Sequence, residues 1–190
     1  MFDSTATIDK MRVVVYPEPV LRLKAKSISD FSDPLVKRFC VNLSLFCKQI
    51  GAMGLSAPQI GVSVRVIVIN DELRDSISRV EEETKKIIPR PMVLINPVIT
   101  NTTGESVYKE GCVSLPDIFG NVKRFNEFDI EYQDVDGNQL VEHVKDTRND
   151  IFGTIVQHEI EHLNGVLFID NLSPFDKDKV IKKINKLRKR

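Results

Sequence analysis

Residues 157–162, with the sequence QHEIEH, limit the fold of this chain more than any other segment. Two histidines four residues apart lie on one face of an α-helix, one turn from each other. His158 and His162 can therefore bind a single transition-metal ion. Glu159 lies beside the first histidine, where it can take a proton from water on that metal. The pattern predicts a helix with one enclosed face and indicates metal-assisted hydrolysis.

The composition is that of one globular domain covering residues 1–190, with residues 1–10 as a loose extension. The 27 basic and 27 acidic residues cancel, so the whole molecule has no general attraction to polyanions. No apolar run is long enough to span a membrane, and residues 1–10 lack the pattern of a signal peptide. Three cysteines without paired spacing predict reduced thiols and a cytoplasmic location.

The hydrophobic pattern predicts an α+β fold, in which antiparallel strands surround a central metal-binding helix and N-terminal and C-terminal helices lie outside. In chain order, the expected elements are a strand at 12–16, a helix at 34–50 after Asp33, strands at 64–69 and 92–99, a hairpin at 128–144 around Asp136 and Gly137, a helix capped at Asn149 or Asp150 that ends near Gly165, and a basic helix at 174–190 capped by Ser173. Residues 71–91 carry many charges of both signs and predict a solvated insertion. His143 falls in the second strand of the hairpin, where we expect it to be exposed.

A catalytic site of this kind needs a third protein ligand, since two imidazoles and an open position are incomplete. No histidine follows His162, and Asp170 is the nearest carboxylate before the last helix. Upstream, residues 110–114 (EGCVS) offer the thiolate of Cys112 in a tight turn. One thiolate with two imidazoles suits Fe(II), Zn(II), Co(II) or Ni(II). The alternative for Cys112 is a buried free thiol.

The loop at residues 53–61 (MGLSAPQIG) is the third informative segment. Its glycines allow the backbone to approach a ligand closely, and the Gln59 amide could donate a hydrogen bond to an oxyanion. The alternative is an ordinary Gly/Pro loop. On the predicted metal-binding helix, Ile151 and Ile155 share one stripe with the histidines, so they either form an apolar wall of the site or belong to the core.

Together these segments resemble peptide deformylase. That family carries G-x-G-L-A-A-P-Q, E-G-C-L-S and Q-H-E-x-D-H-L in this order, and this chain has AMGLSAPQ at 52–59, EGCVS at 110–114 and QHEIEHL at 157–163. The family often opens with Y-P-D-P-x-L-R, and residues 16–22 are YPEPVLR. The resemblance covers about residues 11–174 and depends on three linked motifs, which makes it far more specific than the histidine motif alone.

The resemblance implies a metal-dependent hydrolase that removes the formyl group from the formyl-methionine of newly made polypeptides and releases formate. Cys112, His158 and His162 would bind the metal, with water in the fourth position. Fe(II) is the metal that the resemblance implies, and Zn(II), Ni(II) or Co(II) could replace it. Glu159 would act as general base and then donate a proton to the leaving amine.

The resemblance also implies how substrate is held. The Gln59 amide and the Val113 backbone N–H would donate to the oxyanion. Gly54 would lie beside the substrate backbone, while Ile151 and Ile155 would line the pocket for the methionine side chain. The partners implied are therefore N-formyl-methionyl nascent peptides.

The chain departs from the family pattern at Ala52 for Gly, Ser56 for Ala, Val113 for Leu and Glu161 for Asp. A positive φ at Ala52 would be strained. Arg124, at a position where the family carries arginine, is expected to pair with Glu161. Residues 117–120 (DIFG) are more apolar than the polar group that the family often has there, which affects contacts with the peptide backbone.

Two other functions compete with this one. A zinc peptidase with the same helix motif would need a glutamate or histidine ligand downstream, and residues 163–190 contain neither. A non-catalytic ribosome-binding protein would use the basic C-terminal helix, since residues 176–190 hold eight Lys or Arg against two Asp. A deformylase could also use this helix to contact the ribosome, and a solvated helix packed on the domain is the alternative. A bacterial cytosol is the expected location, with an organelle or a phage genome as alternative origins.

Overall fold

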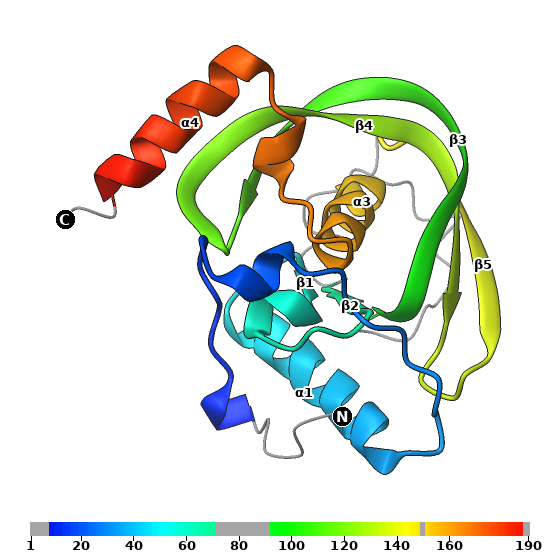
Figure 1. The fold of residues 1–190 in the computed structure, drawn as a ribbon. Coiled ribbons are helices and arrows are strands. Elements are labelled where there is room, and N and C mark those ends of the chain that lie inside the picture. The colour runs from blue at the N-terminus through cyan, green and yellow to red at the C-terminus, as the bar shows by residue number, and fades with distance from the viewer. Residues whose placement is uncertain (1–7, 71–91, 149–150, 188–190) are drawn as a thin grey trace.

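The computed structural model describes residues 8–70, 92–148 and 151–187, and its centre is an antiparallel sheet in the order β1-β2-β3-β4-β5 (Figure 1). The strands are β1 (Gly54–Ser56), β2 (Val66–Ile69), β3 (Met92–Cys112), β4 (Leu115–Gln133) and β5 (Gln139–Val144). The helices are α1 (Pro34–Gln49), α3 (Ile151–Leu163) and α4 (Pro174–Leu187). The α+β prediction is confirmed, with α3 inside the curve of the sheet.

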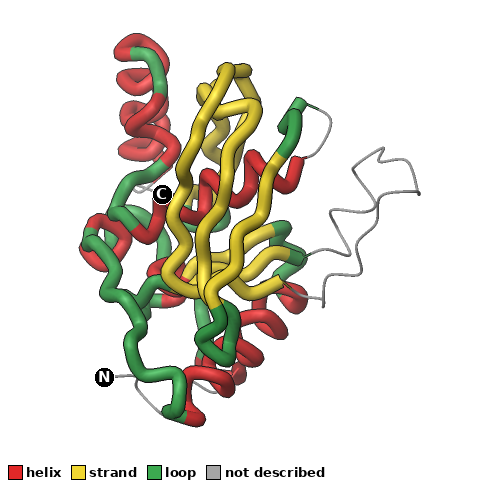
Figure 2. The backbone as a smooth tube through the Cα atoms, turned by 90° about the vertical axis from the view of Figure 1, so that its right-hand side faces the viewer, coloured by secondary structure: helices red, strands yellow, loops and turns green. Residues whose placement is uncertain are grey.

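Strands β3 and β4 form one long, strongly bent ribbon that wraps around α3 (Figures 1 and 2). They pair from Ile95 and Gln133 to Cys112 and Leu115, with register shifts near Ile95, Thr100 and Gly111. Extra residues of this kind bend a strand and increase its twist. The bends therefore let a single hairpin enclose a helix that a flat sheet would leave exposed.

Three clusters of buried apolar side chains hold the elements together. The first lies between the sheet and α3, the second between α1 and strands β1 and β2, and the third under α4 and the 3-10 turn η5 (Phe168–Asn171). At the centre of the first cluster, a Cβ on Gly153 would lie 2.4 Å from Thr147 Cγ2 and 2.8 Å from Val144 Cγ1. Helix α3 thus approaches β5 more closely than any larger residue would allow.

The predicted helix boundaries are confirmed where they can be compared. Asp33 caps α1 by accepting a hydrogen bond from the Leu35 N–H at 2.8 Å, and Gly51 follows the helix with a φ of 66°. Ser173 is the cap of α4, since its Oγ accepts from the Asp176 N–H at 3.2 Å. These local signals determine where the helices begin and end.

Two expectations about strands were wrong. Residues 12–16 form no strand, because the N–H groups of Val14 and Tyr16 donate to the carbonyls of two separate segments, Gln59 and Ser114. The strand expected at 92–99 continues to Cys112. The expected hairpin is observed as β4 and β5, and His143 lies exposed on β5 with its Nδ1 at 2.6 Å from Asp129. The predicted insertion at 71–91 and the caps at 149–150 lie outside the described residues.

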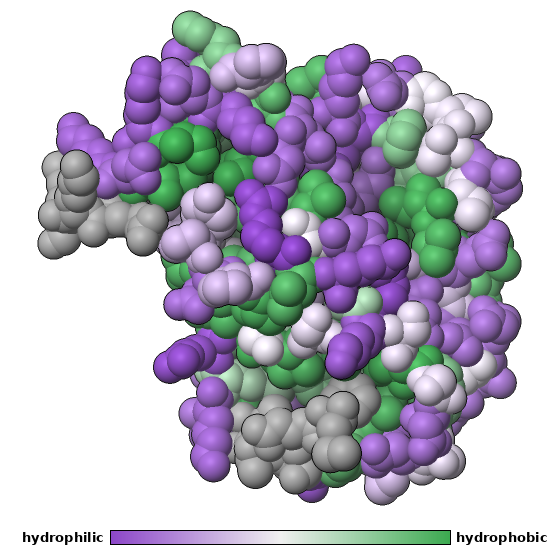
Figure 3. Space-filling view, viewed as in Figure 1, coloured by the Kyte–Doolittle hydropathy of each residue, from purple (hydrophilic) through white to green (hydrophobic). Residues whose placement is uncertain are grey.

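Helix α4 extends from the body of the molecule (Figures 1 and 2). Val180 and Ile184 are buried in the third cluster, while Lys179, Lys182 and Lys186 are exposed. Figure 3 shows this as polar side chains over α4 with apolar ones where it meets the body. Among the described helices, none combines the length and apolar character of a membrane span.

Candidate metal centre

Three side chains of types that can bind a metal ion converge at the end of the β3–β4 ribbon. Cys112 ends β3, and His158 and His162 lie one turn apart on α3. One donor atom from each lies within 4.8 Å of the other two, and the Cys112 Sγ is 3.3 Å from the His162 Nε2. A tetrahedral ion with bonds of about 2.0–2.3 Å separates its ligands by roughly 3.5 Å. The donor set therefore fits one small divalent ion.

The turn that presents Cys112 is built by its neighbours. Gly111 pairs with Phe119 across the ribbon, and a Cβ at Gly111 would lie 2.7 Å from the Phe119 ring. Beyond Cys112 the chain turns at residues 113–114, and the buried Leu115 starts β4. The Val113 N–H thus follows Cys112 directly at the start of this turn. Predicting Cys112 in a tight turn was correct.

A buried network of charges orients the first histidine. The His158 Nδ1 lies 3.0 Å from the Glu110 Oε2, so an Nδ1–H that donates to this carboxylate leaves Nε2 for the metal. Arg124 donates to both Glu110 oxygens at 2.6 and 2.7 Å. Its Nη1 donates to Glu161 at 2.6 Å and its Nη2, which also serves Glu110, donates to Glu161 at 3.0 Å, so the expected Arg124–Glu161 pair is confirmed. We call these three residues the Glu110–Arg124–Glu161 network.

Electrostatics keeps this network charged although it is buried. The side chain of Arg124 is 2% exposed and that of Glu110 is 7% exposed. Burial alone would raise the pKa of the Glu110 carboxyl, but hydrogen bonds from Arg124 and His158 outweigh burial and lower it. Glu110 therefore remains an acceptor at neutral pH, as a metal-binding histidine requires of its partner.

Glu159 lies beside the donors with its side chain enclosed. It is 4% exposed, and burial raises the pKa of its carboxyl to about 7 against the opposing effects of His158 and Ser56. Within the described part of the chain, its Oε2 atom is buried without a hydrogen-bond partner. A carboxyl that titrates near neutrality and has a vacant oxygen can accept a proton and return it.

Gly54 places backbone directly against Glu159. A Cβ at Gly54 would lie 2.5 Å from Ile155 Cγ2 and 3.0 Å from Glu159 Oε1. Ile155 is buried against this backbone, whereas Ile151 lies one turn earlier and is partly buried beside the first cluster. Of the residues predicted to bind substrate, the structure thus brings Gly54 and Ile155 together next to Glu159, with Ile151 farther along the helix.

Gln59 is oriented by its own loop, in the 3-10 turn η3 (Ala57–Ile60). Its Oε1 accepts hydrogen bonds from the N–H and the Oγ–H of Ser56, both at 2.8 Å. Its Nε2 consequently points toward the metal centre and lies 3.4 Å from the Cys112 Sγ. The Ser56 hydroxyl, which the family's alanine lacks, adds a second bond that fixes this amide. Ala52 is buried without a positive φ, so the expected strain there does not arise.

The sequence did not reveal three contributors. Glu110 adjoins the cysteine motif, which was the one available signal. Ser56 was noted only as a departure from the family pattern. Phe168 of η5 stacks on the His158 ring with centroids 6.1 Å apart, and no local pattern links these two residues.

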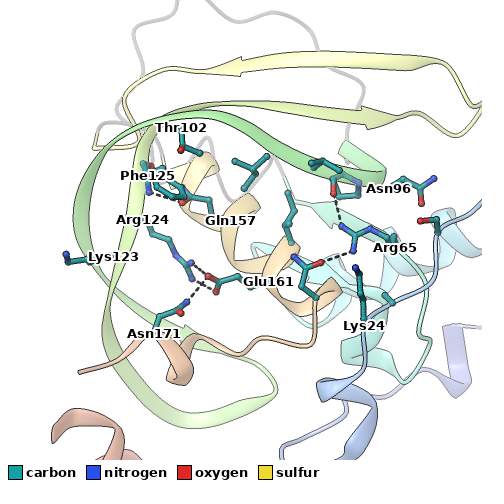
Figure 4. Close-up of a pocket in the computed structure, with 17 residues that line it drawn as sticks. Lys24, Arg65, Asn96, Thr102, Lys123, Arg124, Phe125, Gln157, Glu161 and Asn171 are labelled. Atoms are coloured by element: carbon teal, nitrogen blue, oxygen red, sulfur yellow. Dashed lines mark hydrogen bonds and ion pairs between the residues drawn. The ribbon is translucent and has the colours of Figure 1, made fainter. Parts of the chain in front are cut away.

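A groove lined by both polar and apolar side chains lies beside this network (Figure 4). It has a volume of about 1010 Å³, and β3, β4, α3 and residues 24–27 contribute to its walls. Arg124, Glu161 and Asn171 line it, but none of the three metal-binding residues does. Solvent in the groove can therefore reach one end of the network.

Comparison with known proteins decides the family. The family model described as polypeptide deformylase matches residues 10–178. The chain belongs to the polypeptide deformylase family. The peptide deformylase of Desulfotalea psychrophila is 35% identical over 176 residues, covering 93% of this chain and 95% of that protein. The peptide deformylase of Mesorhizobium japonicum is 38% identical over 179 residues, covering 93% and 92%.

Solved structures agree with this assignment. The Plasmodium falciparum peptide deformylase in complex with an inhibitor superposes with a TM-score of 0.76 at 33% identity, covering 94% of this chain and 100% of that one. The Thermotoga maritima peptide deformylase superposes with a TM-score of 0.71 at 31% identity, covering 86% and 98%. The chain is thus a metal-dependent deformylase in sequence and in fold.

Proposed function

We propose that this deformylase hydrolyses N-formyl-methionyl nascent peptides to formate and a free amino terminus, using one Fe(II) ion held by Cys112, His158 and His162. The observation that carries the proposal is the convergence of these three donor atoms within 4.8 Å, next to the enclosed Glu159 carboxyl. When bound, the metal would act as a Lewis acid and lower the pKa of water.

The choice of Fe(II) rests on family likeness and on the donor set. One thiolate and two neutral imidazoles bind Fe(II), Zn(II), Ni(II) and Co(II), so affinity alone does not select among them. Fe(II) is readily oxidised, and protein purified in air is expected to contain Zn(II) or Ni(II) instead. Metal analysis of protein prepared without oxygen distinguishes these cases.

Glu159 would move the protons of the reaction. Its vacant Oε2 accepts a proton from the attacking water, and the same oxygen then returns the proton to the leaving amine. Burial raises the pKa of this carboxyl to about 7, so near neutral pH it can both take up and give back a proton. The Gly54 backbone, packed against Glu159, keeps the carboxyl from turning away.

Gln59 and Val113 would stabilise the negative charge that develops on the formyl oxygen. The two bonds from Ser56 hold the Gln59 amide with its N–H group toward the site, so no reorientation is needed during the reaction. The Val113 N–H is the second donor, beside Cys112. The substrate backbone would follow Gly54, with the methionine side chain against Ile155 and Ile151.

The direct test is formate release from formyl-Met-Ala-Ser by anaerobically prepared Fe(II) protein. Glu159→Ala should lower kcat at least about 100-fold, as loss of a general acid–base residue does, while one metal per chain is retained. Glu105→Ala, an exposed glutamate on the ribbon, is the matched control and should keep its rate. Undiminished turnover by Glu159→Ala would contradict the assigned role.

We also propose that α4 contacts ribosomal RNA, which would place the enzyme in a bacterial cytosol near its substrate. Lys179, Lys182 and Lys186 are exposed on α4, and such charges bind phosphates. Changing all three to glutamate keeps Ile184 packed and should weaken co-sedimentation with ribosomes at low salt. Unchanged co-sedimentation would argue against the contact.

A further inference from the structure

The 3-10 turn η5 contacts the metal centre from two directions. Phe168 is 1% exposed and stacks on the ring of His158 at 6.1 Å between centroids. At the other end of the turn, Asn171 donates from Nδ2 to the Glu161 Oε1 at 2.7 Å. Asp170 fixes the turn between them, since it pairs with Arg22 and accepts from the Leu167 N–H at 3.0 Å. The turn is therefore held firmly enough to hold other groups in place.

Asn171 completes the set of donors around Glu161. One Glu161 oxygen accepts from both Asn171 and Arg124, and the other accepts only a 3.0 Å bond from Arg124 among the described residues. The Glu161 side chain is 23% exposed to the groove and is one methylene longer than the family's aspartate. Figure 4 shows Arg124 above and Asn171 below the end of this carboxylate, each joined to it by a dashed line. Asn171 thus adds a third hydrogen bond to a carboxylate that Arg124 holds with two, and it joins this partly exposed group to η5.

Glu161 is connected to His158 through two atoms that each take part in two hydrogen bonds. Arg124 Nη2 donates to both Glu110 Oε2 and Glu161 Oε2, so a shift of Glu161 moves the guanidinium. Glu110 Oε2 accepts from Arg124 and also lies 3.0 Å from the His158 Nδ1. A displaced guanidinium would therefore change the direction in which the imidazole is held. Partners of this kind set the orientation of a metal-binding histidine.

We infer that Asn171 is a positioning residue for the metal ligand His158, acting through Glu161, Arg124 and Glu110. The inference rests on the proposed metal site. Retention of the metal would then depend on the exposed Asn171 amide at the edge of the groove, which is four contacts away from the His158 imidazole.

The experiment compares Co(II)-loaded wild type with Asn171→Ala and with Asn171→Asp, which keeps the shape but replaces the donor by a charge. The readouts are the rate of Co(II) release to a chelator and the visible spectrum of the bound Co(II). Loss of a direct partner of a metal ligand lowers affinity about 10–100-fold, so the more distant Asn171→Ala should release Co(II) roughly 3–10-fold faster. Asn171→Asp should release it faster still, because its carboxylate repels Glu161.

Asn138→Ala is the matched control, because Asn138 also makes an exposed 2.8 Å bond to a carboxylate, that of Asp134, far from the site. It should release Co(II) at the wild-type rate. Failure of the wild type to bind one Co(II) with a thiolate absorption band would overturn the proposed metal site itself. A normal wild type with unchanged Asn171 variants would overturn the positioning role alone. Equal acceleration by Asn138→Ala, or a matching loss of stability in the metal-free Asn171 variants, would overturn it as well.

Discussion

Replacing Arg124 by methionine should destabilise the protein severely, because it leaves a carboxylate buried without its counter-charge. Arg124 is 2% exposed and makes four charge-assisted bonds of 2.6–3.0 Å. Glu110 is only 7% exposed and would lose its counter-charge, whereas Glu161 at 23% exposed can rehydrate. Removing one partner of a buried pair costs about 3–5 kcal/mol, and most of this loss should come from Glu110.

The assay is urea unfolding of metal-free protein at pH 7, so that metal affinity does not enter the free energy of unfolding. Arg148→Met is the control, since its pair with Asp146 is exposed and its loss should leave the free energy of unfolding nearly unchanged. Adding Glu110→Gln to Arg124→Met removes the stranded charge and should recover part of the stability. A loss below about 1 kcal/mol in Arg124→Met, or no recovery in the double variant, would refute the argument.

Gly54→Ala should lower kcat sharply while the chain still folds, because its Cβ would overlap Ile155 Cγ2 at 2.5 Å; formate release and circular dichroism measure the two effects. Burial raises the pKa of Cys40 and Cys47 to about 12, so iodoacetamide at pH 8 should label Cys112 but neither of these two in folded, metal-free protein, as mass spectrometry would show. The Asp170→Asn variant should have a free energy of unfolding about 1 kcal/mol lower than that of the wild type at pH 7, measured by urea unfolding. Burial tends to raise the pKa of the Asp170 carboxyl, but hydrogen bonds lower it below 3.8. The wild type should therefore remain more stable than Asp170→Asn above about pH 4, and this difference in stability should vanish as the pH falls through the lowered pKa of Asp170.

Local signals in the sequence were sufficient for the helices and for the order of the motifs. The caps at Asp33 and Ser173 and the stop at Gly51 depend on neighbouring residues alone, and all three were predicted correctly. Residues 12–16 were mistaken for a strand because their apolar run shows burial but not hydrogen-bond partners. Their N–H groups donate to two segments far away in the chain, which no local pattern records.

The extent of β3 and β4 escaped prediction for a related reason. Residues 100–110 are largely exposed and polar, and register shifts interrupt the alternation that marks a strand. This stretch of β3 is held by pairing with β4, whose Ile118, Val122 and Phe128 supply the buried face.

The metal centre depends on contacts between distant segments, and this limits what sequence alone can establish. Gln59 and Cys112 lie 53 residues apart, and only the family resemblance suggested that they meet. The same resemblance led to the expected Arg124–Glu161 pair, because both positions belong to the family pattern. It could not lead to Asn171, which lies in a polar surface turn. The longer side chain of Glu161 reaches the groove, where Asn171 donates a further hydrogen bond to it. Only the three-dimensional arrangement of the groove and the Glu110–Arg124–Glu161 network reveals this contact.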